Sequence, residues 1–431
     1  MSDLSRRVFD SVLDMLSSEE NPTPIVRLNR VTPYKHTQVY AKLEWYNPFG
    51  AVKDRVAANL VRDAEARGLR LENLVEPTSG NTGMGLAMIA NAKRLKFAAT
   101  LSLAIPEEKR VTLRTFGAKL FEVSDDLCPM PGEPEGAMAK AAELAAQPGW
   151  HQLNQYKNPA NPDAHFRTTG PEVWRQTEGK ITHFVAGLGT CGTITGTGRF
   201  LKSKNPGVKV FGAYPEPGHD IPGVRSLKAL KLTDFYLPNE YDGVTEIGNA
   251  EAYQLCKRLN QEESIIAGPS SGLALAGVFK QVPDEPGAIC VVMFPDNAFK
   301  YASSFKKHLP ELFPAPEGAP AVTAGTALDI DADEAVALVR AGALLLDVRT
   351  PGEYQAGHLV EAENVPLQLI QAGPVAGLPA DKSQTIVLIC GVGKRSHAAM
   401  LLLRAQGHAE VRSVNGGMQQ WVAEGRPLQV R

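Results

Sequence analysis

Lys53 is the first residue of this sequence whose position indicates chemistry. It lies in the stretch Asn47-Pro-Phe-Gly-Ala-Val-Lys-Asp-Arg55, between a β-rich apolar run and a segment with helical apolar spacing. The pattern predicts Lys53 in the first turn of a helix, where the positive end of the helix dipole disfavours a charged amine. A lysine kept near its neutral form there is a good imine-forming amine. Taken alone, the stretch also fits a solvated lysine in an Asp/Arg cluster.

A glycine-rich turn, Gly187-Leu-Gly-Thr-Cys-Gly192, follows a strand pattern and precedes a helix pattern. Its Gly-x-Gly-x-x-Gly spacing, with Glu216 after the next strand, is also that of a dinucleotide fold, so a nicotinamide-dependent oxidoreductase is an alternative. However, the turn lies late in the chain, and hydroxyls at Thr190, Thr193 and Thr195 suit a terminal phosphate held by N–H and O–H donors. We expect a phosphate cup at a helix N-terminus, with a plain tight turn as the structural alternative.

A second anion cradle is indicated by Thr78-Ser-Gly-Asn-Thr82, a small, hydroxyl-rich segment where a strand meets a helix. Its free N–H groups and side-chain donors could hold a substrate carboxylate. On its own the segment is no better than a helix N-cap, a position that Ser, Thr and Asn favour in any case.

A reactive thiol is predicted at Cys390, in the loop Cys390-Gly-Val-Gly-Lys-Arg395 between an apolar strand and a helix that begins near Ser396. Backbone N–H groups, the helix dipole and the neighbouring cations all lower the pKa of a thiol in such a loop. A buried, inert cysteine is the usual alternative. Cys290, inside an apolar strand, fits that alternative better than Cys390 does.

Alternating strands and helices must position these segments. Strands are expected over 39–45, 97–104, 119–124, 181–186, 208–213 and 288–294, and helices from near 84, 106, 135, 249 and 271. A short amphipathic helix is also expected over residues 2–17. Such alternation predicts an α/β fold with parallel sheets and right-handed crossovers, with ligands bound at the carboxyl ends of the strands.

The chain divides near residue 309. Its 431 residues indicate about three domains of ordinary size. Four prolines between 310 and 320 predict a stiff, exposed linker. We therefore expect a catalytic unit over 1–308, a linker over 309–325 and a second α/β unit over 326–431, with buried strands near 344–348 and 385–389.

Composition excludes several classes of function. The 45 Lys and Arg and 47 Asp and Glu residues give a formal charge of −2, which argues against a nucleic-acid or membrane-surface partner. No apolar run approaches the roughly 18 residues of a membrane span, and the N-terminus lacks the apolar region of a secretory signal. Five scattered cysteines without a Cys-x-x-Cys pair argue against disulfides and a metal site. We expect a reducing, cytoplasmic compartment.

Four separated motifs resemble the cysteine synthase family, which are pyridoxal-phosphate β-replacement enzymes of the tryptophan-synthase-β fold type. They are the stretch around Lys53, Pro77-Thr-Ser-Gly-Asn-Thr-Gly83, Gln155-Tyr-Lys-Asn-Pro-Ala-Asn-Pro162 and Gly189-Thr-Cys-Gly-Thr193. The resemblance covers about residues 10–308 and implies a two-lobed unit of PLP fold type II with parallel sheets. Ile221-Pro-Gly-Val-Arg225 is similar to the B-type isozyme, whose roomier site is associated with thiosulfate-like donors.

The resemblance implies roles for individual residues. Lys53 would hold pyridoxal 5′-phosphate through an imine and then remove and return the Cα proton. The cofactor phosphate would be bound by Gly189, Thr190, Cys191, Gly192 and Thr193, and Asn81 would hydrogen-bond the pyridoxal 3′-oxygen. The substrate side would be formed by Thr78, Ser79, Gly80, Thr82, Gln155 and Arg225, most of which would grip the amino-acid carboxylate.

The partner of the pyridine nitrogen departs from the family pattern. The family usually places Ser, or sometimes Cys, at this position, whereas Phe294-Pro-Asp-Asn297 places Asn297 there. An amide can donate to an unprotonated ring nitrogen, which suits β-elimination, whereas Asp296 would protonate the ring. We expect Asn297, with Asp296 as the alternative.

The Cys390 loop belongs to a second resemblance. Together with Asp347-Val-Arg349, Gly357-His358, Glu363-Asn-Val-Pro366 and Asn415-Gly-Gly-Met-Gln-Gln-Trp421, it resembles the rhodanese domain over about residues 325–431. The Cys-x4-Arg spacing is one residue shorter than in the related phosphatases, so the resemblance implies a Cys390 persulfide, with Arg395 as a second catalytic residue. A docking module without turnover is the alternative, although the presence of both residues argues against it.

The two resemblances together imply one sulfur chemistry. The expected reaction forms L-cysteine or S-sulfocysteine from O-acetylserine or O-phosphoserine and a donor such as sulfide or thiosulfate, in a homodimer without a metal. Because a tether raises the effective concentration of a linked donor to about the millimolar range, we hypothesise that the Cys390 persulfide supplies the sulfur.

Overall fold

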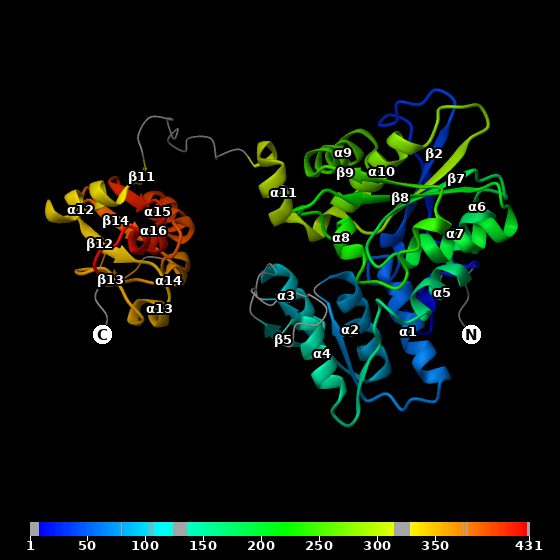
Figure 1. Cartoon of the computed structure of the whole chain (residues 1–431), viewed down its shortest axis with the longest axis horizontal. Helices are drawn as coiled ribbons and strands as arrows, with labels where there is room; N and C mark the ends of the chain where they lie inside the picture. Colours follow the sequence, from blue (N-terminus) through cyan, green and yellow to red (C-terminus); the bar gives the residue numbers. More distant parts are fainter. Residues whose placement is uncertain are drawn as a thin grey trace. The chain divides into compact units, whose positions relative to one another are not determined.

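The computed structural model of the protein describes residues 8–78, 80–102, 105, 107–123, 136–313, 328–373, 375 and 378–428. The chain forms two compact units, Met1–Pro314 and Ala315–Arg431, each with its own sheets and cores (Figure 1). The predicted linker, 309–325, lies mostly outside the described residues, and its first residues include the 3-10 turn η6 (Pro310–Leu312). Within the described residues, no helix is long and apolar enough to cross a membrane.

The larger sheet of the first unit has six strands in the order β1-β2-β10-β7-β8-β9. These are β1 (Ile25–Arg27), β2 (Gln38–Leu43), β7 (His183–Gly187), β8 (Lys209–Pro215), β9 (Gly243–Ile247) and β10 (Ile289–Phe294). All neighbouring pairs are parallel except β1 and β2. Helices cover both faces of this sheet, so successive residues of β7 pack into different cores: Val185 into one, and Phe184 and Ala186 into the other.

Two groups of helices form these layers. The helices α9 (Asn249–Glu262) and α10 (Pro269–Gln281) share a core with one face of the larger sheet, and α7 (Gly192–Lys204) packs on the other. The remaining helices near this sheet are α5 (Ala160–Arg167), α6 (Thr169–Gln176), α8 (Leu227–Leu230) and α11 (Ala302–His308).

The smaller sheet of the first unit has four parallel strands in the order β5-β4-β3-β6. They are β3 (Asn73–Pro77), β4 (Lys96–Ser102), β5 (Lys119–Val123) and β6 (Trp150–Gln152). The helices around it are α1 (Lys53–Ala66), α2 (Asn81–Lys93), α3 (Glu107–Thr115) and α4 (Ala137–Ala145), and they form the lower lobe in Figure 1. The unit therefore has the two lobes and parallel sheets that the sequence predicted.

Two expected elements differ from those observed. In the described part of the expected helix 2–17, the only helical turn is the 3-10 turn η1 (Val12–Met15), in which Ser11 and Asp14 cap each other and no residue is buried. Leu13 packs against the core of the smaller sheet, but Val12 and Met15 are exposed, so the turn has no continuous apolar face that would stabilise a longer helix. The strand expected over 39–45 ends at Leu43, and a 3-10 turn, η2 (Glu44–Tyr46), follows.

The second unit is built on one parallel sheet with the order β11-β15-β14-β12-β13. Its strands are β11 (Asp329–Ile330), β12 (Leu344–Asp347), β13 (Glu363–Asn364), β14 (Ile386–Ile389) and β15 (Val411–Val414). Its helices are α12 (Ala332–Arg340), α13 (Pro351–Gln355), α14 (Leu367–Ala372), α15 (Lys394–Ala405) and α16 (Gly417–Ala423). Separate apolar cores on the two faces of the sheet make this a small α/β unit.

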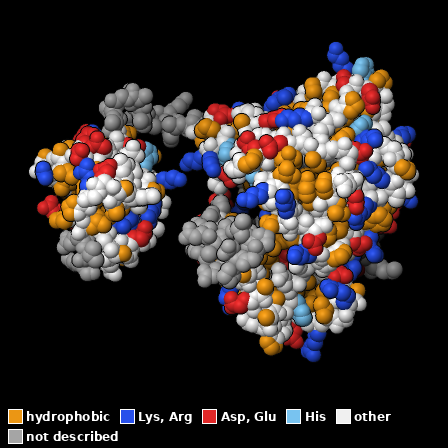
Figure 2. Space-filling view, in the orientation of Figure 1, with side chains coloured by type: hydrophobic (Ala, Val, Ile, Leu, Met, Phe, Trp, Pro, Cys, Tyr) orange, Lys and Arg blue, Asp and Glu red, His pale blue; other side chains and the backbone are white. Residues whose placement is uncertain are grey.

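Charged side chains of both signs are interspersed on the visible surface of each unit (Figure 2). This distribution agrees with the formal charge of −2. Among the described residues, no group of three or more His, Cys, Asp or Glu side chains is arranged to hold a metal ion.

Candidate active site

Lys53 is the first residue of α1, as the sequence predicted. The turn before it uses Gly50 with a φ of +83°, a conformation that favours glycine. Asp54 accepts a hydrogen bond from the Phe49 N–H at 2.8 Å and so holds this turn. The Val52 N–H donates to the Pro295 carbonyl at 2.8 Å. Lys53 is thereby fixed beside the segment that follows β10.

The surroundings of Lys53 favour its neutral amine. Burial lowers the pKa of Lys53 to about 8, although the nearby Cys191 thiol and Asp296 carboxylate oppose this effect. An ordinary lysine has a pKa of about 10.4, so a far larger share of Lys53 is unprotonated at neutral pH. The amine therefore has the property needed to form an imine with an aldehyde.

The glycine-rich turn after β7 leads into α7, and close packing requires its glycines. A Cβ on Gly189 would lie 2.4 Å from the Gly223 carbonyl oxygen, and one on Gly192 would lie 1.9 Å from Asn161 Oδ1. Cys191 is the N-cap of α7, with a φ of +65°. The first N–H groups of a helix have no partner within it, and here they lie in a turn without bulky side chains.

Two hydroxyls of this turn are oriented from α5. Thr190 Oγ1 accepts a hydrogen bond from Asn161 Nδ2 at 3.0 Å, and Thr193 Oγ1 lies 3.1 Å from His165 Nε2. Burial and the nearby cations hold the pKa of His165 well below its usual value, so its ring is neutral. Among the described residues, Asn161 Oδ1 is a buried acceptor without a partner. The turn and its hydroxyls fit a terminal phosphate group.

Asn161 and His165 were not recognised in the sequence as parts of this site. Asn161 stands in the Asn-Pro-Ala-Asn-Pro motif, and His165 follows it by one helical turn. The motif was a signal for Asn161, but nothing in the local pattern around His165 indicates its contact with α7.

The hydroxyl-rich loop after β3 begins α2 and contacts the segment after β6. Thr78 Oγ1 accepts from the Gly83 N–H at 3.2 Å, and Gly80 is the N-cap of α2. Thr82 Oγ1 donates to Gln155 Oε1 at 2.7 Å. Four of the predicted substrate-side residues are therefore neighbours, while Ser79 lies outside the described residues.

Asn81 connects the two lobes. Its Nδ2 donates to Asp296 Oδ2 at 2.6 Å, and its Oδ1 accepts from Lys300 Nζ at 3.1 Å. Lys300 also donates to the Gly50 carbonyl at 2.8 Å, in the turn before Lys53. Tyr301 donates its hydroxyl to the same oxygen of Asp296. The predicted cofactor residue Asn81 and the alternative residue Asp296 thus form one network beside Lys53.

Asn297 does not join this network. Its Oδ1 accepts from the Phe299 N–H at 3.1 Å, so the side chain caps the 3-10 turn η5 (Ala298–Lys300) and is only half-buried. Asp296 is 1 % exposed, and Ser271, in the first turn of α10, is fully buried. Ser271 Oγ has no hydrogen-bond partner among the described residues. The expectation placed Asn297 inward, but the turn after β10 directs its side chain to the local backbone.

Ser271 was not recognised in the sequence either. It belongs to Gly268-Pro-Ser-Ser-Gly272, a hydroxyl-rich helix start of the same kind as 78–82. A Cβ on Gly268 would lie 2.5 Å from Asp296 Oδ1, so this helix start packs directly against the network of Asn81 and Asp296. The two serines at the start of this helix were the signal in the sequence that could have indicated a site residue here.

Arg225 lies between the phosphate turn and the Gln155 segment. Its N–H donates to the Leu188 carbonyl at 2.8 Å, and its Nη2 donates to the Tyr156 hydroxyl at 2.5 Å. The guanidinium lies 4.8 Å from the centre of the Tyr156 ring, within the range of a cation–π interaction. Arg225 is therefore placed at the predicted substrate side.

A buried network of charged side chains contacts the first turn of α1 through Arg55. Arg55 forms a bidentate ion pair with Glu44 at 2.7 and 2.9 Å and also pairs with Glu172. Lys42 donates to Glu172 at 2.6 Å, and all four side chains are at most 1 % exposed. Arg55 lowers the pKa of Glu44 although burial alone would raise it. Two cations and two anions thus neutralise each other in the interior.

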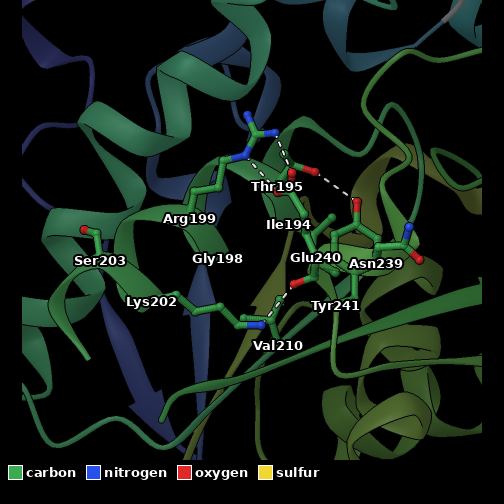
Figure 3. A pocket seen from close by; sticks show the side chains of 10 residues that line it. All are labelled: Ile194, Thr195, Gly198, Arg199, Lys202, Ser203, Val210, Asn239, Glu240 and Tyr241. Atoms are coloured by element: carbon green, nitrogen blue, oxygen red, sulfur yellow. Dashed lines mark hydrogen bonds and ion pairs between the residues drawn. The ribbon is translucent and has the colours of Figure 1, made fainter. Parts of the chain in front are cut away.

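The pocket in Figure 3 lies away from these groups. It has a volume of about 340 Å³, between α7 and the 3-10 turn η4 (Pro238–Glu240). Its cations are already paired, because Arg199 binds Glu240 at 2.7 Å and Lys202 binds Asp242 at 2.8 Å. Thr195, one of the hydroxyls expected at the phosphate, lines this pocket, and its Oγ1 donates to the Phe235 carbonyl at 3.0 Å.

Cys390 directly follows β14, in the loop that leads into α15. Its side chain is buried, and Ser396 Oγ lies 3.5 Å from its Sγ. Burial would raise the pKa of Cys390, but the Ser396 hydroxyl and the N–H groups of Val392, Arg395 and Ser396 outweigh burial and lower it. The site therefore favours a thiolate, as the sequence predicted.

Arg395 lies close to the Cys390 loop, because a Cβ on Gly391 would be 3.3 Å from its Nη2. Its guanidinium binds Glu353 with both arms, at 2.8 Å and 2.6 Å. Glu353 was not recognised in the sequence, and it comes from α13, more than 30 residues earlier in the chain. Cys390 and Arg395 are thus brought together, with an acidic residue beside them.

Comparison with known families agrees with both sites. Residues 16–296 match the family model described as pyridoxal-phosphate dependent enzyme, and residues 331–424 match the rhodanese-like domain. The first match excludes the nicotinamide alternative, because it assigns the Lys53 unit to a different cofactor. The phosphate turn and the neutral amine of Lys53 fit this cofactor.

The similar proteins are cysteine synthases and related enzymes. Cysteine synthase B of Salmonella typhimurium is 39 % identical over 284 residues, which cover 65 % of this chain and 92 % of that protein. Cysteine synthase of Staphylococcus aureus is 37 % identical over 314 residues, covering 70 % and 98 %. The structure of O-ureido-L-serine synthase has a TM-score of 0.64 at 34 % identity, covering 72 % of this chain and 98 % of that one. The chain therefore belongs to the pyridoxal-phosphate dependent enzymes of the cysteine synthase type and also contains a rhodanese-like domain.

Proposed function

We propose that the Lys53 unit forms L-cysteine or S-sulfocysteine by β-replacement on O-acetylserine or O-phosphoserine. The observation that carries this proposal is a partly buried amine with a pKa of about 8 beside a phosphate-sized turn and a hydroxyl-rich helix start. When bound, pyridoxal phosphate withdraws electrons from the substrate Cα, so that a group on Cβ can leave and be replaced.

The residues of this chain divide the work of binding. Lys53 Nζ holds the cofactor, and the phosphate is bound by Gly189, Thr190, Cys191, Gly192 and Thr193. Asn161 and His165 orient two of these hydroxyls from α5. Asn81 reaches the ring oxygen from α2. The amino-acid carboxylate is bound by Thr78, Ser79, Gly80, Thr82 and Gln155.

Lys53 also moves the proton of the reaction. When it is not bound to the cofactor, Lys53 Nζ would be able to take the Cα proton at neutral pH because of its lowered pKa. It returns the proton after sulfur has added to Cβ. Arg225 lies at the substrate side with a positive charge, so it can pair with the phosphate of O-phosphoserine or with an anionic sulfur donor.

The cofactor ring nitrogen has three candidate partners in this chain. We propose Ser271, because its buried hydroxyl has no partner among the described residues and can donate to an unprotonated nitrogen. Asn297, the expected partner, already caps η5. Asp296 binds Asn81 and Tyr301 through Oδ2, and its Oδ1, which also has no partner among the described residues, can only accept from a protonated ring nitrogen. Ser271→Ala should shift the absorbance maximum of the bound cofactor, whereas Asn297→Ser should not. A shift in Asn297→Ser alone would restore the original assignment.

Borohydride reduction tests the cofactor site directly. The yellow protein is reduced and digested, and the labelled peptide is identified by mass spectrometry. The label should lie on Lys53. A label on another lysine would overturn the proposed site, although the family would still stand.

Steady-state kinetics with both serine esters would settle the substrate. If Arg225 pairs with a phosphate, Arg225→Gln should raise the KM for O-phosphoserine at least about tenfold and change that for O-acetylserine little. An equal effect on both esters would place Arg225 outside leaving-group recognition. We further propose a homodimer, which sedimentation at several protein concentrations tests.

For the second unit we propose sulfur transfer through a Cys390 persulfide. The Cys390 thiolate attacks the outer sulfur of a sulfane donor, so that a new S–S bond forms and the rest of the donor leaves with the electron pair of the broken bond. Two equivalents of a thiol then release this sulfur as hydrogen sulfide and are themselves oxidised to a disulfide. The sulfide adds to Cβ at the Lys53 site.

Sharing one chain favours transfer between the two sites. The linker keeps the Cys390 persulfide at an effective concentration of about the millimolar range near the Lys53 site if it spans the sites, so sulfide is released close to where it reacts. Cys390→Ser should then leave cysteine synthesis from added sulfide intact and reduce synthesis from thiosulfate plus a thiol. Cutting the linker should have the same effect at low protein concentration.

Two results would contradict the transfer. Equal thiosulfate-dependent rates in the wild type, Cys390→Ser and the separated units would show that the activities are independent. An isolated second unit without any sulfurtransferase activity would favour the docking module.

A further inference from the structure

The cation beside Cys390 is already neutralised. Arg395 Nη1 and Nη2 donate to the two carboxylate oxygens of Glu353 at 2.8 Å and 2.6 Å. The Arg395 interaction lowers the pKa of Glu353 to about 2, so the carboxylate stays ionised at neutral pH. An anion that approaches Arg395 therefore also approaches a fixed negative charge.

Glu353 is held in place independently of Arg395. Its Oε2 accepts from the Thr350 N–H at 3.0 Å and from the Thr350 hydroxyl at 2.8 Å. The Glu353 N–H in turn donates to Thr350 Oγ1, which completes a capping box at the start of α13. The carboxylate is therefore anchored by its own helix start and does not depend on Arg395 to stay beside the loop.

Apart from the exposed cation Lys394, the rest of the Cys390 loop offers an incoming donor little charge. The sulfur receives its hydrogen bonds from the backbone N–H groups of Val392, Arg395 and Ser396 and from the Ser396 hydroxyl, all of which are neutral. Val392, between two glycines, is 51 % exposed and presents an apolar surface. Lys394 is the exposed cation of the loop.

We propose that Glu353 makes Cys390 prefer sulfane donors with a single negative charge and an apolar group, namely organic hydropersulfides, over the thiosulfate dianion. This inference rests on the proposed sulfurtransferase function of Cys390. With a hydropersulfide, Cys390–S⁻ and R–S–S⁻ give Cys390–S–S⁻ and R–S⁻. With thiosulfate, the same attack releases sulfite, SO₃²⁻. Both steps balance, and they differ in the charge that must approach Glu353.

The test measures loading of Cys390 in the full chain with two probes, the hydropersulfide of ethanethiol and thiosulfate. Mass spectrometry follows the gain of one sulfur atom on the Cys390 peptide over time. Glu353→Gln keeps the size of the side chain and removes its charge. Because the Coulomb energy is proportional to the charge of the donor, the loading rate with the thiosulfate dianion should rise by about the square of the factor for the hydropersulfide monoanion, for example about tenfold against about threefold.

Two further variants separate charge from shape and from general effects. Glu353→Asp keeps the charge, so it should keep the preference for the hydropersulfide even if the bidentate pair is lost. Asp333→Asn removes an acid that pairs with Arg426 at 2.8 Å, away from the Cys390 loop, and should leave both rates unchanged.

The possible outcomes are distinct. An unchanged ratio of the two loading rates in Glu353→Gln, or a lower thiosulfate rate, would overturn the inference. A wild type that prefers thiosulfate would do the same. If neither probe adds sulfur to Cys390, the proposed sulfurtransferase function is wrong, and this inference fails with it.

Discussion

Lys53 and Cys390 are both nucleophiles at the beginning of a helix, and opposite forces activate them. The reactive form of a lysine is neutral, and burial lowers the pKa of Lys53 to about 8 against the opposing effect of Cys191 and Asp296. The reactive form of a cysteine is charged, so burial works against Cys390, and hydrogen bonds to the sulfur must outweigh it. Burial therefore favours the reactive form of Lys53 and disfavours the reactive form of Cys390.

Cys191 shows that a helix N-terminus is not sufficient to activate a thiol. It is the N-cap of α7 and 3 % exposed, yet burial raises its pKa to about 12. Its sulfur lies 3.9 Å from the Gly189 carbonyl, which is an acceptor. At Cys390 the neighbours are N–H and O–H donors. Burial outweighs the Lys53 charge and the Tyr241 hydroxyl, which lower the pKa of Cys191, whereas at Cys390 several hydrogen-bond donors together outweigh burial.

The largest expected effect is the loss of the Lys53 amine. Lys53→Ala should reduce cysteine formation from added sulfide by about 10²–10⁴-fold, because Lys53 is the group proposed to move the Cα proton. Steady-state rates of sulfide-driven synthesis measure this, with Cys390→Ser as the matched control that should keep the wild-type rate. A Lys53→Ala protein with more than about a tenth of the wild-type rate would contradict the role of Lys53.

The second expected effect concerns stability. Glu172→Gln leaves Lys42 and Arg55 with one carboxylate between them in the interior, so it should lower the free energy of unfolding of the first unit by about 3–5 kcal/mol. Urea denaturation measures the change. Glu240→Gln removes one partner of the exposed Arg199 pair and should cost at most about 1 kcal/mol. Equal losses in both variants would show that the buried network contributes no more to the free energy of unfolding than an exposed ion pair does.

The third prediction uses the pKa of Lys53. In the apo-protein, the rate at which the cofactor binds covalently should rise about tenfold per pH unit below pH 8 and level off above it, because only the neutral amine reacts. Asp296→Asn removes a carboxylate that raises this pKa, so the curve should move to lower pH. Absorbance of the bound cofactor follows the reaction. A rate that still increases up to pH 10 would mean that burial does not tune Lys53.

The smallest effect is expected at Cys390. Ser396→Ala removes one donor to the sulfur and should raise the pKa of the thiol by about one unit, the value of a single hydrogen bond to a charged group. The rate of alkylation by iodoacetamide against pH reports the pKa. Cys191, Cys256 and Cys290 are buried with raised pKa values and should not interfere. An unchanged pKa would show that the backbone N–H groups stabilise the thiolate without help from the Ser396 hydroxyl.

The same contrast explains how far the sequence predicted the structure. The helix start at Lys53 and the Cys390 loop depend on neighbours within a few residues, so local pattern placed both correctly. The strands β7 and β14 were also recognisable in the sequence, because buried parallel strands are continuous apolar runs. The α/β fold with parallel sheets followed from this alternation.

Contacts between segments that are distant in the sequence could not be predicted from the local sequence pattern. The burial of Ser271 and the capping of η5 by Asn297 depend on how the turn after β10 meets α10. The pairing of Arg395 with Glu353 joins α15 to α13. The expected helix over 2–17 failed for the same reason, since its stability depended on a buried face that the described residues do not form.

The transfer of sulfur from Cys390 to the Lys53 site is tested most directly by following one sulfur atom. The full chain is loaded at Cys390 with ³⁴S from a labelled hydropersulfide, freed of the donor, and mixed with an activated serine and a thiol in the presence of unlabelled sulfide. We predict that wild-type cysteine contains ³⁴S well above the share expected from mixing with the bulk sulfide, and that Cys390→Ser gives none. Cysteine with only the bulk isotope ratio, while ³⁴S leaves Cys390 into solution, would contradict the transfer.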